Sequence, residues 1–274
     1  MSITAAEVNK LRQITGAGMM DCKKALVESN GDFEKAIDFL RKKGQKVAAN
    51  RSDREAKEGF VFAKTNGNGS NGVVFVLSCE TDFVAKNEEF QGFAKSVADF
   101  ALENKIATED ELLASELNGT KISDKLVDMI GKIGEKIEIS RYSFLADAKV
   151  IAYNHPGNRL ATLLAFNKAE AGNGDVGKDV AMQVAAMNPV AIDKDFVSAE
   201  ILERELEIAR DQVRQEGKPE DMVEKIAQGK LNKFFKENTL LNQDFIKDSK
   251  KTVAQYLKEN GDIKVSAFSR VALG

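Results

Sequence analysis

Residues 78–87, with the sequence SCETDFVAKN, hold the strongest candidate for a functional site. They follow an apolar run at residues 73–77 that predicts a buried strand, and a helical pattern begins near Asn87. Connections face solvent and often carry function. In this one a carboxylate, Asp82, stands beside a large aromatic ring, Phe83. The ring is therefore either tucked back into the core or held out for a partner.

The residue types needed for catalysis are scarce elsewhere. His155 is the only histidine, so one chain offers no convincing Ser-His-Asp, Cys-His or histidine-based metal site. Cys22 and Cys79 are far apart, match no metal spacing and are predicted to be reduced core thiols. No pair of carboxylates stands out as an acid–base couple. Catalysis by carboxylates alone stays open, but the sequence offers no candidate catalytic residue, metal ligand or cofactor site.

One glycine-rich segment has a nucleotide-like spacing. Gly67, Gly69 and Gly72 fit G-x-G-x-x-G, but a dinucleotide fingerprint requires a helix directly after the glycines. An apolar strand pattern follows instead, which favours a hairpin loop. An enzyme that binds nucleotide here is the alternative, and it predicts that the isolated chain binds GDP or ATP.

The composition is that of an ordinary globular protein. The 274 residues are 43% hydrophobic and 30% charged, with a formal net charge of -3. Such a balance argues against nucleic acid as the main ligand. The start of the chain lacks a basic segment followed by an apolar run, and no stretch approaches the roughly 20 apolar residues of a membrane span. We expect a cytoplasmic protein that binds neither membrane nor nucleic acid.

Residues 1–50 predict three short helices. Thr4 and Glu7 form a capping-box pattern, Gly16 ends the first helix, and Asp32 is placed to cap the third. The residues expected to face the core are Val8, Leu11 and Ile14, then Cys22, Ala25 and Leu26, then Ala36, Ile37 and Leu40. A polar linker is expected at residues 51–58.

The remaining chain predicts two similar α+β subdomains, at residues 59–145 and 146–274. Strands at 59–64 and 73–78 precede a helix at 87–103, and strands at 149–154 and 159–167 precede another helix, so hairpin followed by helix occurs twice. Each subdomain is expected to hold an antiparallel sheet, with a last strand at 263–268 in the second. Two narrow apolar stripes at 198–236 predict an inserted antiparallel helical hairpin, either an interaction element or a stabilising appendage. The fold class is α+β.

Two motifs resemble a known family. Residues 15–26, TGAGMMDCKKAL, and residues 81–87, TDFVAKN, are similar to the two signatures of the bacterial elongation factor Ts family, which are guanine-nucleotide exchange factors of elongation factor Tu. The resemblance extends to the turn at His155 and Arg159, to the helical hairpin and so to essentially the whole chain. The first three helices also resemble a ubiquitin-associated domain. The chain ends after its last predicted strand, so contacts of the C-terminal extension in longer members are not carried over.

The resemblance implies roles for particular residues. Gly16, Met19 and Met20 would dock on the G domain of elongation factor Tu. Apart from the resemblance, the position of the two methionines at a helix start leads us to expect one outward and one in the core. The segment made of Thr81, Asp82, Phe83 and Val84 would intrude beside the Mg²⁺ and phosphate site, helped by the turn of His155 and Arg159. The implied partner is elongation factor Tu, both GDP-bound and nucleotide-free. A homodimer or a two-to-two complex stays open.

A third hypothesis treats the three-helix unit as a peptide-binding or ubiquitin-like-binding module on an unrelated scaffold. It predicts that residues 1–50 carry the activity by themselves.

Overall fold

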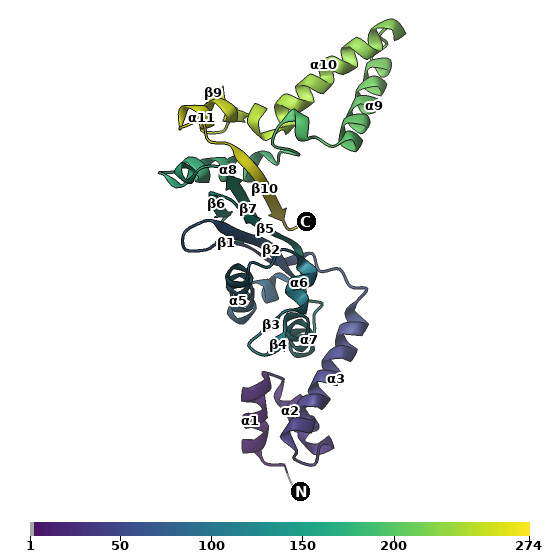
Figure 1. Ribbon diagram of the computed structural model, residues 1–274. Coiled ribbons are helices and arrows are strands. Elements are labelled where there is room, and N and C mark those ends of the chain that lie inside the picture. The colour runs from purple at the N-terminus through teal and green to yellow at the C-terminus, as the bar shows by residue number, and fades with distance from the viewer. Residues whose placement is uncertain (1–2) are drawn as a thin grey trace.

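The computed structural model describes residues 3–274 and is elongated. A small helical unit stands at one end, two packed sheets with their helices form the middle, and a pair of long helices projects at the other end (Figure 1). The C-terminus returns to the middle, beside the sheets. The chain therefore presents well-separated surfaces on one axis.

Three helices form the N-terminal unit, and its core confirms most of the expected inward residues. They are α1 (Ala5–Thr15), α2 (Met19–Glu28) and α3 (Phe33–Arg51). The buried cluster consists of Val8, Leu11, Cys22, Ala25, Leu26 and Ala36. The capping box at Thr4 and the cap at Asp32 are both present. The likeness of this unit to a ubiquitin-associated domain stays a prediction, as do the domain boundaries.

The inward prediction for Ile14 is wrong. Its side chain is 58% exposed, because Val8 and Leu11 already fill the contact of α1 with its neighbours. Ile14 lies in the last turn of α1 and lines a cleft that faces the next unit. Ile14 is therefore an exposed apolar residue that can contact another protein.

The first sheet is antiparallel with the order β1-β2-β5. Its strands are β1 (Glu58–Thr65), β2 (Asn71–Cys79) and β5 (Glu138–Ala146). The chain between β2 and β5 forms α4 (Asp82–Ala85), α5 (Glu88–Asn104), α6 (Glu109–Ala114), the ribbon β3 (Glu116–Leu117) and β4 (Thr120–Lys121), and α7 (Ile122–Ile133). The sequence reasoning found α5 and α7 but missed α4, α6 and the ribbon, which are too short for a periodic signal.

The second sheet repeats the arrangement with the order β10-β7-β6. Its strands are β6 (Lys149–Asn154), β7 (Leu160–Phe166) and β10 (Val265–Ala272), so the last strand joins this sheet as predicted. The other elements are η1 (Ala169–Gly172), α8 (Val176–Met187), η2 (Lys194–Phe196), η3 (Leu240–Asn242), β8 (Asp244–Phe245), β9 (Asp248–Thr252) and α11 (Val253–Glu259). In both sheets a distant third strand pairs with the second strand of the hairpin.

The strand β2 is buried on both faces. Phe75 and Leu77 belong to the core beneath α5, whereas Val74 and Val76 belong to a second cluster together with Leu163 of β7. Successive side chains of a strand point to opposite faces, so a strand between two cores reads as a continuous apolar run. The two sheets thus pack face to face, and the side-chain amide of Asn154 adds bonds of 2.8 Å to both backbone groups of Ala63.

The projecting helices are α9 (Ala199–Gln215) and α10 (Glu220–Asn238), which confirms the predicted antiparallel hairpin. Its seam is narrow and consists of Ala209, Val213, Val223, Ala227 and Leu231. Ion pairs join the two helices beside the seam, with Arg210 at 2.8 Å from Glu224 and Lys230 at 2.7 Å from Glu216. Across residues 3–274, the structure contains no helix with the length and apolar character to cross a membrane.

Candidate functional site

Phe83 is held out into solvent. It lies in α4, the single helical turn after β2, and its side chain is 83% exposed. The next two residues anchor the turn, because Val84 packs against the core and Ala85 is buried within it. The interpretation of Phe83 as a core residue is therefore wrong. A large aromatic ring displayed on an anchored turn offers apolar contact area to a partner.

Asp82 accompanies the ring as a charged group. Its carboxylate accepts a 2.6 Å hydrogen bond from the ammonium of Lys86, one turn later, and that bond holds the pKa of Asp82 below its usual range. The carboxylate therefore stays ionised at neutral pH. Asp82 and Phe83 together present an ion-paired carboxylate beside an exposed aromatic ring.

The turn between β6 and β7 lies on the same side of the sheets. The hydroxyl of Tyr153 is 2.9 Å from Nδ1 of the exposed His155, and Arg159 makes a two-pronged ion pair with Glu58. Glu58 begins β1 and is paired with Cys79, four residues before Phe83. The bond to Glu58 raises the pKa of Arg159, and the negative charge of Asp82 adds to this effect. The structure thus brings the predicted 81–84 segment and the 155–159 turn to one end of the core.

The remaining predicted residues lie elsewhere, on the N-terminal unit. Gly16 ends α1 in the left-handed conformation, with φ +67°, and donates its N–H to the carbonyl of Arg12 at 2.7 Å. Met19 and Met20 follow at the start of α2 and are 54% and 74% exposed, so the prediction that one of them faces inward is wrong. Cys22, Ala25 and Leu26 fill the inward face of that helix instead.

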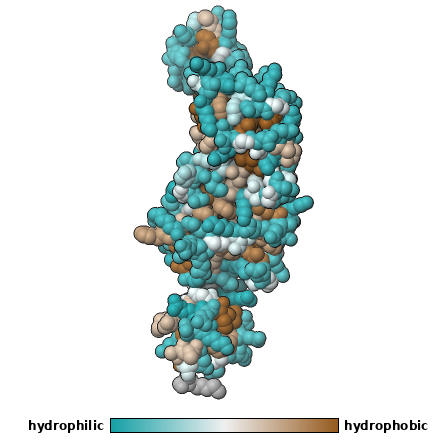
Figure 2. Space-filling model, turned by 90° about the vertical axis from the view of Figure 1, so that its left-hand side faces the viewer, coloured by the Kyte–Doolittle hydropathy of each residue, from teal (hydrophilic) through white to brown (hydrophobic). Residues whose placement is uncertain are grey.

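We name Ile14, Met19 and Met20 the docking patch, after the docking role predicted from the sequence for the two methionines. They stand on either side of the turn between α1 and α2 and are all more than half exposed. Figure 2 shows apolar side chains at the surface of this unit, at the bottom of the view. Methionine side chains are flexible and polarisable, which suits an adaptable apolar contact with another protein.

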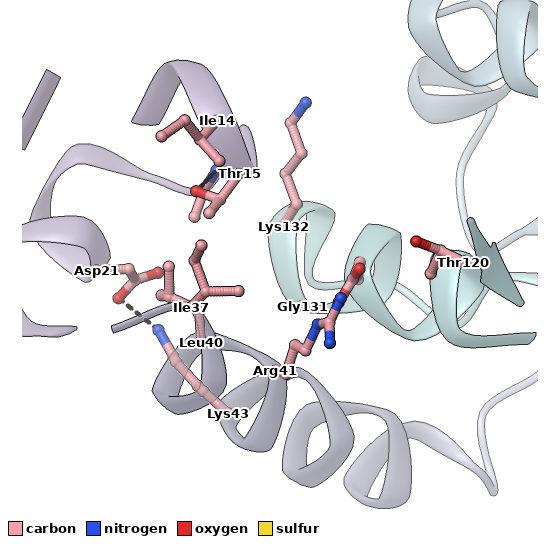
Figure 3. Close-up of a pocket in the computed structure, with 12 residues that line it drawn as sticks. Ile14, Thr15, Asp21, Ile37, Leu40, Arg41, Lys43, Thr120, Gly131 and Lys132 are labelled. Carbon is pink, nitrogen blue, oxygen red and sulfur yellow. Dashed lines mark hydrogen bonds and ion pairs between the residues drawn. The ribbon is translucent and has the colours of Figure 1, made fainter. Parts of the chain in front are cut away.

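A cleft of about 300 Å³ separates the three-helix unit from α7. Figure 3 shows Ile14, Arg41 and Lys43 on one side and Gly131 and Lys132 on the other. None of the predicted site residues of the core lines it. Beside the cleft the two parts touch directly through glycines, since a Cβ added to Gly131 would lie 2.8 Å from Cα of Gly44.

The segment from Glu80 to α4 is fastened by residues that sequence reasoning missed. Glu135 accepts hydrogen bonds from the amides of Glu80 and Thr81 at 3.1 and 3.0 Å, and from the hydroxyl of Thr81 at 2.7 Å. Arg51, at the end of α3, donates two bonds to the carboxylate of Glu80. No local pattern marks these partners, because more than 50 residues separate Glu135 from the segment it holds.

Within residues 3–274, no group of three His, Cys, Asp or Glu side chains is arranged to hold a metal ion. The glycine-rich segment lies between β1 and β2 and leads directly into a strand, which confirms the hairpin loop. Cys22 and Cys79 are buried free thiols. Burial and the nearby charge of Glu135 raise the pKa of Cys79 to about 12, so this thiol stays protonated at neutral pH.

Comparisons with known proteins give one consistent family. The family model described as elongation factor TS matches residues 80–274. The elongation factor Ts of Flavobacterium psychrophilum is 55% identical to the chain, with 100% of this chain and 99% of that relative aligned. The elongation factor Ts of Amoebophilus asiaticus is 52% identical, with both chains covered completely, and that of Porphyromonas gingivalis is 50% identical over 100% of this chain and 99% of its own. The chain belongs to the elongation factor Ts family.

Proposed function

We propose that this chain binds elongation factor Tu in its GDP-bound and nucleotide-free states and promotes release of GDP. Membership of the elongation factor Ts family supports a translation elongation factor that acts as an exchange factor and not as a chemical enzyme. The observation that carries the finer proposal is the 83% exposure of Phe83 on an anchored turn, beside the ionised Asp82.

The proposed mechanism is a wedge. A GTPase holds its nucleotide through backbone amides around the phosphates and through Mg²⁺ that bridges the phosphate oxygens, so small displacements of that cradle weaken binding. Phe83 would enter an apolar crevice of elongation factor Tu near this cradle, and the charge of Asp82 would come close to the phosphates. Full burial of one such ring contributes about 1.5–3 kcal/mol. Exchange factor and GDP must then weaken each other's binding by the same factor.

The turn at residues 155–159 would support the wedge. His155 is exposed beside Tyr153. The pairing of Arg159 with Glu58 fixes this turn against the start of β1, which lies beside Cys79 at the end of β2. We assign His155 to a direct contact with elongation factor Tu and Arg159 to holding the turn. Thr81, bonded to Glu135, and Val84, packed against the core, would hold the Phe83 turn in place.

The direct test is stopped-flow release of fluorescent GDP from elongation factor Tu, with and without the chain. Acceleration that saturates with chain concentration supports the proposal, and no acceleration refutes it. Titration of the isolated chain with labelled GDP and ATP tests the enzyme alternative. That alternative requires binding in the absence of elongation factor Tu, whereas an exchange factor of this kind shows none.

The docking patch gives a separate prediction. Met20→Asp places a charge in the most exposed apolar position of the patch, so we expect the half-saturating chain concentration to rise by roughly ten-fold or more, the equivalent of about 1.4 kcal/mol. The maximal rate of GDP release should change much less, because Asp82 and Phe83 lie in α4, which packs against β1, β2 and α5 of the core. The measurement is the concentration dependence of stopped-flow GDP release.

Met222→Asp is the matched control for this prediction. Met222 is 45% exposed on α10, far from the docking patch along the axis of Figure 1. An equal or larger effect of this control would assign docking to the helical hairpin and would contradict the role of Met20.

A further inference from the structure

Two carboxylates fasten the segment just before the Phe83 turn to the segment that follows α7. Glu135, which follows α7, accepts the amides of Glu80 and Thr81, and in return Glu80 accepts the amide of Lys136 at 2.7 Å. Each acid therefore satisfies backbone groups of the other segment. Hydrogen bonds from amides to ionised carboxylates are among the stronger ones in proteins. We name this reciprocal pair the carboxylate clasp.

The clasp reaches α4 through Thr81. The hydroxyl of Thr81 donates to Glu135 at 2.7 Å, and the same oxygen accepts the amide of Val84 at 3.4 Å as the cap of α4. The carbonyl of Thr81 also accepts a bond from the buried thiol of Cys79 at 3.2 Å. The residue immediately before Asp82 and Phe83 is thus held from three directions.

The clasp is also connected to the unit that carries the docking patch. The guanidinium of Arg51 donates to both oxygens of Glu80, at 3.1 and 3.0 Å, and the side chain of Glu80 is only 17% exposed. Arg51 is the last residue of α3, and α3 runs from the three-helix core past α7 (Figure 1). One helix therefore spans from the N-terminal unit to the base of the Phe83 turn.

The alternative is that these hydrogen bonds only stabilise the connection between β2 and α4 and have no role in exchange. The side-chain bonds are, however, concentrated on Glu80 and Thr81, the two residues that enter the turn, whereas Val84 and Ala85 hold its other end by apolar packing and Phe83 stays exposed. A one-turn helix has little stability of its own. Its direction is set by the bonds at Glu80 and Thr81 together with the packing of Val84 and Ala85.

We propose that Glu80 and Glu135 are positioning residues for exchange, holding Phe83 in the orientation that enters elongation factor Tu, and that Arg51 fixes this orientation relative to the docking patch. This inference rests on the proposed exchange function. It assigns no contact with the partner to these three side chains.

The test compares Glu135→Ala and Glu135→Gln by stopped-flow GDP release from elongation factor Tu. Glu135→Ala should lower the maximal release rate by roughly ten-fold, the effect expected for losing charge-assisted bonds that position the wedge. The half-saturating concentration should stay within about two-fold, because the docking patch is untouched. Glu135→Gln keeps an acceptor for both amides and should restore most of the maximal rate. Glu103→Ala, an exposed acid of α5, is the matched control and should behave as wild type.

A double-variant cycle separates positioning from general damage. With Phe83→Ala already present, adding Glu135→Ala should lower the release rate no further, because there is no ring left to position. A further full loss in that background would overturn the proposal, and so would a single Glu135→Ala variant with an unchanged maximal rate.

Hydrogen–deuterium exchange of the free chain tests the clasp without elongation factor Tu. The amides of Glu80 and Thr81 should exchange roughly ten-fold faster or more in Glu135→Ala than in wild type. If wild type fails to accelerate GDP release, the proposed function fails and this measurement still decides whether the clasp exists. Unchanged protection of both amides would refute the clasp even where exchange activity is present.

Discussion

Phe83→Ala is expected to remove most of the acceleration of GDP release while the fold and the docking of the chain stay intact. The ring is 83% exposed, so its truncation opens no cavity and should change the free energy of unfolding by less than about 0.5 kcal/mol. In the complex, the lost burial of about 1.5–3 kcal/mol would lower the maximal release rate by roughly 10- to 140-fold. The half-saturating concentration should change much less, since the docking patch remains.

The measurement is stopped-flow release of fluorescent GDP over a range of chain concentrations, with thermal unfolding in parallel. Phe196→Ala is the matched control, because Phe196 is 70% exposed on the short helix η2 of the other subdomain. Equal losses in the two variants would point to exposed aromatics in general and would contradict a specific wedge. A normal maximal rate in Phe83→Ala would assign the effect on GDP to the turn of His155 or to docking.

Gly131→Ala is expected to disturb the joint between the N-terminal unit and the core. The new Cβ would lie 2.8 Å from Cα of Gly44, where neither helix backbone has a flexible side chain to move aside. The helices α3 and α7 would have to separate, and overpacking of this kind costs about 1–3 kcal/mol of the free energy of unfolding. Chemical denaturation measures this loss.

The same substitution should also reduce exchange activity. Separation of α3 from α7 displaces the docking patch relative to Phe83, so one complex can no longer use both surfaces equally well. We expect a higher half-saturating concentration for GDP release and a lower maximal rate, whereas Met20→Asp should change mainly the former. An unchanged concentration dependence in a destabilised Gly131→Ala chain would show that the relative placement of the two parts has no role in exchange.

Two other helical glycines provide controls for Gly131→Ala. Gly92 in α5 and Gly229 in α10 have no atom within 4 Å of an added Cβ. Alanine at either position should stabilise the chain by about 0.5–1 kcal/mol through helix propensity. Destabilisation by these controls would mean that glycine replacement is harmful for some reason other than contact between α3 and α7.

Local signals predicted much of this fold from the sequence. Three features each depend on only a few neighbouring residues, and the structure contains all of them: the cap at Thr4, the helix end at Gly16 and the turn at residues 155–158. The segment at 81–84 also stood out locally, as an acid and an aromatic in a connection. What the sequence left open was the orientation of Phe83, because burial depends on the elements that pack around a residue.

The remaining features depend on contacts between distant residues. Glu80 and Glu135 are 55 positions apart, and Gly44 meets Gly131 across two helices whose glycines look merely unfavourable in isolation. Helical spacing alone places Ile14 inward, whereas the structure exposes it. Spacing identifies which residues share a face of a helix, but it does not show how far along that face the neighbouring helices extend.

The burial of β2 on both faces has a consequence for thermal unfolding of the protein. Phe75 and Leu77 belong to the core under α5, while Val74 and Val76 belong to the contact with the second sheet. One strand therefore contributes side chains to two hydrophobic cores. Neither core can open while the other keeps its full set of contacts. The two sheets are thereby joined into one cooperative unit of unfolding, whose calorimetric enthalpy belongs to both together. The helical hairpin is held by its narrow seam and by a few bonds at the end of α10, such as that from the amide of Val190 to the carbonyl of Asn238, so it lies outside that unit and should unfold first.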